Sequence, residues 1–125
     1  MPTGTEEMRA DAPPLTGGGD GGVPDFAVET LGQDHCRVAV VIVNVMGLHA
    51  RPASEFVKLA GSYACGVSIR KGNQQVDGKS ILQLFSLAAE VGTRLTLEGR
   101  GPDAHAALVA LAELVRSGFR EQDGG

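Results

Sequence analysis

The chain is poor in aromatic residues and long apolar runs, and these shortages exclude several protein classes. Among its 125 residues there is no tryptophan and aromatic residues make up 4%, so aliphatic side chains must fill any core. No run reaches the roughly 18–20 apolar residues that a membrane span needs. The N-terminus also lacks the basic-then-apolar pattern of a signal peptide. We therefore expect a cytoplasmic protein that does not act at a membrane.

Cysteine is scarce as well. The two cysteines, Cys36 and Cys65, match no metal-ligand spacing. Because free cysteine is usually buried, we expect both to be reduced, buried small residues. The sequence predicts no metal site and no cofactor.

Charge is unevenly distributed along the chain. Residues 1–34 carry seven acidic residues and one basic residue, whereas residues 35–125 carry eight acidic and ten basic residues. The first stretch also holds four of the six prolines and a glycine run over residues 17–22. Such a segment buries too little apolar surface to offset its ordering entropy, which predicts a flexible acidic tail over residues 1–34. Phe26, Val28 and Leu31 offer at most a short docking contact within it.

The remaining chain predicts one folded domain over residues 35–120 and a polar C-terminal tail over residues 121–125. The domain is near neutral and has no basic stripe, which argues against binding to nucleic acid.

Hydrophobic periodicity and turn residues predict seven elements in the order β-α-β-β-α-β-α. The expected strands cover residues 36–44, 67–70, 74–77 and 94–98, and the expected helices cover residues 50–60, 81–87 and about 102–117. The last helix is expected to have Pro102 at its first position. This order indicates an α+β two-layer open-faced sandwich, with three helices covering one face of a four-stranded sheet.

The turn between the first strand and the first helix carries the most informative motif, Gly47-Leu48-His49-Ala50-Arg51-Pro52-Ala53. The first N–H groups of a helix have no internal partner, and the helix dipole adds positive charge there. Pro52 gives up no useful donor at this place. The motif therefore puts a histidine beside free backbone donors and a guanidinium, which suits an anion.

The chemistry that fits this turn is phosphoryl transfer through His49. Imidazole is nucleophilic only when neutral, as it mostly is at cellular pH. The Ala50 N–H group and the planar fork of Arg51 can hold the phosphoryl oxygens and stabilise the transition state. The alternative is a plain helix-cap histidine beside a solvated arginine, and the intact motif on a strand-to-helix turn argues against it.

The motif, together with Lys79-Ser80-Ile81 and the order of elements, resembles the HPr family of histidine-containing phosphocarrier proteins over about residues 36–119. The resemblance implies an antiparallel sheet of strand order 1-4-2-3 and a monomer. It also implies that His49 accepts phosphate on Nδ1 from phosphorylated enzyme I of the phosphoenolpyruvate-dependent phosphotransferase system. His49 then passes the phosphate to an enzyme IIA domain during sugar uptake, so that the chain is a carrier and not an enzyme. The long acidic tail is unusual for the family and leaves open a regulatory role or a misassigned start codon.

Ser80 matches the position that a dedicated HPr kinase/phosphorylase phosphorylates in many bacteria. The resemblance therefore adds that kinase and a transcriptional regulator as partners. A phosphate at a helix N-terminus is compatible with the fold and adds about two negative charges to the surface. The simpler alternative is that Ser80 is only a helix N-cap, and the two roles are compatible.

A partner-binding patch is expected around His49. Its predicted members are Leu48, Ile81, Leu84 and Phe85, with Lys58 as a rim charge for acidic partners. The alternatives are that about half of the apolar members face the core and that Lys58 is merely solvated.

Two other functions remain open. One is the same chemistry in a regulatory, nitrogen-related phosphotransferase system without sugar transport. The other is a regulatory binding module that acts through Ser80 and in which His49 does not turn over.

Overall fold

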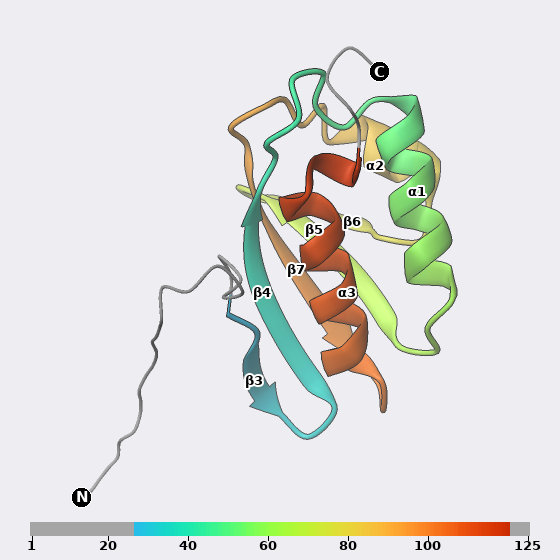
Figure 1. Ribbon diagram of the computed structural model, residues 1–125. Helices are drawn as coiled ribbons and strands as arrows, with labels where there is room; N and C mark the ends of the chain where they lie inside the picture. The colour runs from blue at the N-terminus through green and yellow to red at the C-terminus, as the bar shows by residue number, and fades with distance from the viewer. Residues whose placement is uncertain (1–26, 121–125) are drawn as a thin grey trace, which may run out of the picture.

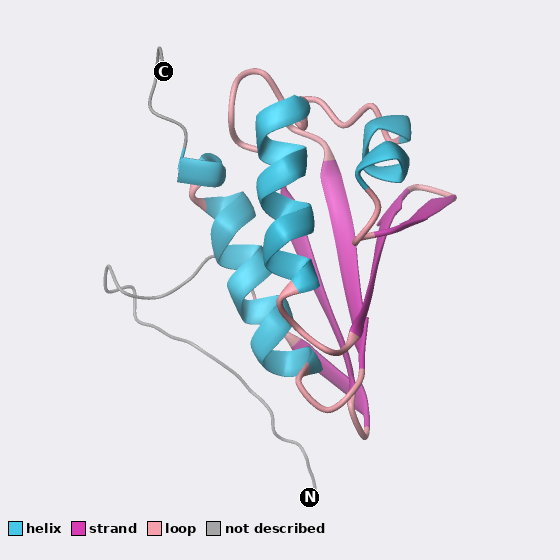
Figure 2. Ribbon diagram, turned by 90° about the vertical axis from the view of Figure 1, so that its right-hand side faces the viewer, coloured by secondary structure: helices cyan, strands magenta, loops and turns pink. Residues whose placement is uncertain are grey.

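The computed structural model describes residues 27–120, so the predicted tails over residues 1–26 and 121–125 lie outside the described residues. The elements in chain order are β3 (Glu29–Gly32), β4 (His35–Val41), α1 (Ala50–Gly61), β5 (Gly66–Lys71), β6 (Gln74–Asp77), α2 (Ile81–Ser86), β7 (Arg94–Arg100), α3 (Ala104–Arg116) and a 3-10 turn at Gly118–Arg120. The five strands form one antiparallel sheet in the order β3-β4-β7-β5-β6. Helices α1 and α3 lie side by side over one face of this sheet, and α2 packs beside α1 (Figures 1 and 2).

The predicted fold class is confirmed, and the four predicted strands lie in the predicted order β4-β7-β5-β6. The strand count and the tail boundary are corrected, because Glu29–Gly32 forms a fifth strand at the edge beside β4. Two side-chain contacts hold this segment in addition to its pairing with β4. Its Glu29 carboxylate accepts hydrogen bonds from Arg37 at 2.9 and 3.0 Å, and Val28 packs against the core.

Two predicted boundaries also differ from the structure. The first strand ends at Val41 instead of Asn44, because the chain turns there toward α1. Pro102 lies in the turn before α3, which begins at Ala104. This turn requires Gly101, whose φ is +144° and whose added Cβ would lie 2.7 Å from the Cα of Cys65.

The core lies between the sheet and the helices and is almost entirely aliphatic, as predicted. Inward residues of the three central strands meet Phe56 of α1 and Leu108 and Leu111 of α3. Cys36 and Cys65 are buried and form no disulfide, as predicted. Among residues 27–120, no helix is long and apolar enough to cross a membrane.

Asp103 links the start of α3 to the loop before β5. Its carboxylate accepts the N–H groups of Ala64 and Cys65, each at 2.8 Å. The hydrogen bond from Ala64, followed by those from Cys65, lowers the pKa of Asp103. A carboxyl whose pKa is lowered by folding stabilises the chain above its unfolded pKa, and this contribution is lost as the pH falls through the folded pKa.

We therefore predict that Asp103→Asn is less stable than the wild type at pH 7 and loses less stability on acidification. Urea unfolding at pH 7 and below about pH 4, the usual range of an aspartate pKa, measures both effects. Asp34→Asn, which changes an exposed aspartate in the turn between β3 and β4, is the control. Equal dependence of the urea midpoint on pH in wild type and Asp103→Asn would contradict the prediction.

Candidate functional site

His49 is the N-cap residue of α1. Its backbone is extended, with φ −87° and ψ −166°, and its carbonyl accepts the N–H of Ala53 at 2.9 Å. Its half-buried side chain makes no capping hydrogen bond to the helix. The helix is therefore held by the backbone of His49, and capping does not occupy the imidazole.

A network of short hydrogen bonds fixes the loop that leads into His49. The Asn44 side chain donates to the Gly47 carbonyl at 2.7 Å, and the N–H of His49 donates to the same carbonyl at 2.9 Å. The N–H of Leu48 donates to the carbonyl of Ala89 at 2.9 Å, which ties this loop to the segment before β7. Sequence analysis missed the role of Asn44, although a polar residue at the end of an apolar run was a usable signal.

Gly47 is the point of closest contact in this loop. Its φ is +71°, and an added Cβ would lie 2.6 Å from the Ala89 carbonyl oxygen and 3.0 Å from the Cα of Glu90. A side chain at this position would therefore force the backbone of Ala89 and Glu90 to shift.

We predict that Gly47→Ala lowers stability by more than the roughly 1–2 kcal/mol that the left-handed conformation alone costs an L-residue. The same change should displace His49 from its position at the helix N-terminus. Gly72→Ala is the matched control, since Gly72 also has a positive φ of +59° but nothing lies within 4 Å of an added Cβ. Urea unfolding of both variants measures the difference, and equal losses would show that the contact with Ala89 is unimportant.

The start of α1 combines an arginine with the positive end of the helix dipole. Ala50 and Arg51 are its exposed first two residues, and their N–H groups belong to the unpaired first turn of the helix. The first turn contains no acidic residue. Pro52 is buried and anchors this turn to the core. The arrangement suits an oxyanion beside His49.

Within residues 27–120, no group of three or more His, Cys, Asp or Glu side chains is arranged to hold a metal ion.

Ser80 lies at the N-cap of α2, where its Oγ accepts the N–H of Gln83 at 3.3 Å. The neighbouring Lys79 is held by its ammonium group, which donates to the Tyr63 carbonyl at 2.8 Å. Asp77 accepts the N–H of Lys79 at 2.9 Å. Ser80 is thus a half-buried helix cap on an ordered turn, in agreement with the structural role that the sequence predicts.

The predicted partner-binding patch is partly wrong. Leu48 and Leu84 are core residues, with 8% and 0% of their surface exposed, so neither can contact a partner. Phe85 is 42% exposed, Ile81 is half-buried and Lys58 is exposed. The structure instead exposes three apolar side chains that sequence analysis missed, namely Leu82 of α2 and Val45 and Met46 of the loop before His49.

Known proteins share this domain. The family model of the HPr component phosphorylation site of the phosphotransferase system matches residues 36–117. The phosphocarrier protein HPr of Pseudomonas aeruginosa is 45% identical over 83 residues, which are 66% of this chain and 92% of that protein. The phosphocarrier protein NPr of Shewanella violacea is 39% identical over 82 residues, which are 66% of this chain and 90% of that protein. The crystal structure of HPr-C-His from Thermoanaerobacter tengcongensis matches with a TM-score of 0.67 and 37% identity, covering 69% of this chain and 97% of that one.

The matched residues include the whole motif around His49 and also Ser80, whereas β3 precedes them. Sequence, fold and the geometry of the α1 N-terminus agree. The chain therefore belongs to the HPr family of phosphocarrier proteins of the phosphotransferase system.

Proposed function

We propose that His49 accepts a phosphoryl group from phosphorylated enzyme I and passes it to a histidine of an enzyme IIA domain. The observation that carries this proposal is the position of His49. Its imidazole lies at the N-terminus of α1 without serving as the cap, next to Arg51 and without a carboxylate in the first helical turn. Family membership supports the same role.

Each transfer is a displacement at phosphorus. The lone pair of His49 Nδ1, the atom that the resemblance implies, forms a new N–P bond while the bond from phosphorus to the donor breaks and leaves its electron pair there. The N–H of Ala50 and the guanidinium of Arg51 hold the charged phosphoryl oxygens during the transfer. The same steps in reverse pass the group to enzyme IIA. The protein thus acts as a carrier that is consumed and regenerated, not as an independent catalyst, and we place it in the cytoplasm.

Incubation of the purified chain with enzyme I, magnesium and phosphoenolpyruvate tests the proposal. We expect a mass gain of one phosphoryl group that is lost in acid, as phosphohistidine is. Absence of the gain while a known HPr is phosphorylated in the same mixture would overturn it.

A second candidate is the regulatory, nitrogen-related branch without sugar transport, which the relative named NPr favours. The two branches differ in the acceptor. Transfer from the phosphorylated chain to a sugar-specific enzyme IIA supports sugar uptake, whereas exclusive transfer to an enzyme IIA of the nitrogen-related system supports regulation.

Regulation at Ser80 is the finer part of the proposal. Its hydroxyl lies at the N-terminus of α2, where a phosphate is compatible with the helix dipole. An HPr kinase/phosphorylase would add this phosphate, and a transcriptional regulator would recognise the product. The alternative of a binding module that acts through Ser80 alone requires His49 to be inactive. Phosphorylation of the chain by enzyme I would refute this alternative.

We predict that ATP and HPr kinase add an acid-stable phosphate to the wild type and none to Ser80→Ala. Because Ser80 also caps α2, the variant should lose about 0.5–2 kcal/mol of stability. Ser86→Ala, at the other end of the same helix, is the control. Equal labelling of wild type and Ser80→Ala would assign the phosphate to another residue and remove this part of the proposal.

A further inference from the structure

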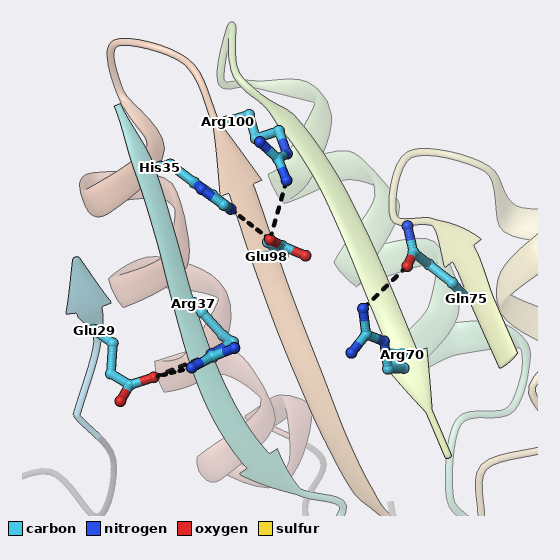
Figure 3. Close-up of polar contacts among 7 residues, drawn as sticks. All are labelled: Glu29, His35, Arg37, Arg70, Gln75, Glu98 and Arg100. Atoms are coloured by element: carbon cyan, nitrogen blue, oxygen red, sulfur yellow. Dashed lines mark hydrogen bonds and ion pairs between the residues drawn. The ribbon is translucent and has the colours of Figure 1, made fainter. Parts of the chain in front are cut away.

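The face of the sheet opposite α1 and α3 is uncovered in the described part of the chain, and arginine is prominent on it (Figure 3). Outward positions hold Arg37 on β4, Arg70 on β5, and Arg94 and Arg100 on β7. Four arginines on one sheet face form a charge pattern that the transfer chemistry at His49 does not use.

Only two of the four arginines form ion pairs with described residues. Arg37 pairs with Glu29 at 2.9 Å and Arg100 with Glu98 at 3.4 Å, while His35 also bonds to Glu98 (Figure 3). Arg70, in contrast, reaches only the neutral side chain of Gln75, at 3.4 Å. Within residues 27–120, Arg94 has no carboxylate partner. Among these residues, Arg94 therefore keeps an unpaired positive charge, and Arg70 forms no ion pair although its charge acts on the nearby Glu98 carboxylate.

These two arginines border a hollow with a floor of small side chains. Ala39 lies opposite Thr96 across β4 and β7, Arg70 lies opposite Thr96 on the other side, and Arg94 precedes Thr96 by two residues on the same face. Two adjoining hollows both include Ala39, one with Arg37 and Arg70 at its border and the other with Arg94. We call this surface the arginine groove, formed by Ala27, Arg37, Ala39, Arg70, Arg94 and Thr96, with Glu29 paired to Arg37 at its border.

Ala27 lines both hollows, and the chain enters the described domain there. The 26 residues before it carry five carboxylates, at Glu6, Glu7, Asp11, Asp20 and Asp25, against the single base Arg9. The groove and the segment attached to its border thus have opposite charge. A short covalent link gives the segment an effective concentration in the millimolar range.

The distances permit contact. A chain extends by at most about 3.3–3.6 Å per residue, so Asp20, seven residues before Ala27, reaches up to about 23–25 Å from it. Neighbouring strands are about 4.8 Å apart, which puts β5, three strands from β3, within about 15 Å. Asp20 can therefore reach both Arg70 and Arg94, whereas Asp25, two residues before Ala27, stays within about 7 Å of the groove border.

We propose that the acidic segment of residues 1–26 binds the arginine groove through carboxylate–guanidinium pairs. The segment then occupies the open face of its own sheet and excludes other polyanions from it. This role is independent of phosphoryl transfer, because the groove contains no residue of the His49 motif.

A nitroxide attached at Thr16→Cys in the full chain tests the proposal. The native cysteines are buried, so the reagent reacts with the new thiol. We expect amide signals of Ser68 and Thr96 on the open face to lose most of their intensity, while those of Glu55 and Lys58 on α1 keep theirs. Arg94→Glu should restore the lost signals, as should salt at about 1 M, where the Debye length is about 3 Å. The matched control Lys58→Glu should leave the loss unchanged.

Two further samples test whether Arg94→Glu acts by perturbing the fold and whether the contact forms between two chains. If Arg94→Glu perturbs the fold, Asp20→Asn with Asp25→Asn removes the charge from the segment instead and should restore the same signals. A mixture of spin-labelled chain with isotope-labelled chain that carries no nitroxide should show no broadening. Broadening in that mixture, equal broadening of α1 and the open face, or no broadening at all would overturn the proposal.

Discussion

His49→Ala is expected to abolish the enzyme I-dependent, acid-labile mass gain while the fold remains intact. The variant lacks the imidazole that acts as nucleophile at the α1 N-terminus, and no other histidine of the described chain lies at the N-cap of an α-helix. The helix cap at this position comes from the backbone, since the carbonyl of His49 accepts the Ala53 N–H and its side chain makes no cap bond. The variant should therefore keep the helix and lose less than the roughly 2 kcal/mol that removal of a side-chain helix cap can cost.

Intact-protein mass spectrometry before and after acid treatment measures this effect, and urea unfolding confirms the fold. His105→Ala is the matched control, because His105 is exposed on α3 and should leave the mass gain unchanged. Retention of an acid-labile phosphate by His49→Ala would assign the chemistry to a different histidine and refute the proposed site.

The sequence predicts those features that depend only on residues close together in the chain, such as hydrophobic periodicity and helix caps. Alternating apolar residues in 94–98 and helical spacing in 50–60 each bury one face, so these elements appear near their predicted bounds. The same holds for His49 and Ser80, because an N-cap is determined by the residues that immediately follow it. The location of both at helix starts followed from the sequence.

Strand β3 could not be predicted in this way. All four of its residues are exposed, so it has no apolar alternation, and its acidic surroundings favoured a tail. Its pairing depends on the edge of β4 and on the ion pair from Glu29 to Arg37, which the fold of the rest of the chain creates. The orientation of α2 was similarly undetermined, since six residues give too few turns to fix which face is buried. For this reason Leu84 was assigned to the surface and Leu82 was overlooked.

Arg51→Ala is expected to slow phosphoryl transfer to and from His49 by about 10²–10³-fold, the usual effect of removing one donor that stabilises a developing oxyanion. Arg51 is exposed on the first turn of α1, beside His49 and distant from the core. Its loss therefore removes a ligand for the phosphoryl oxygens without removing packing. Arg51→Lys keeps the charge but loses the planar fork that can bind two oxygens, and it should fall between wild type and Arg51→Ala.

Rapid-quench measurement of phosphoryl transfer from enzyme I, with urea unfolding of each variant, distinguishes this role from a structural one. Arg100→Ala removes the same side chain from the open sheet face and should leave the transfer rate unchanged. An unfolded Arg51→Ala would make Arg51 a structural residue. A folded Arg51→Ala that transfers at the wild-type rate would show that the helix N-terminus alone holds the phosphoryl group, because the backbone N–H groups of α1 are the donors that this variant retains.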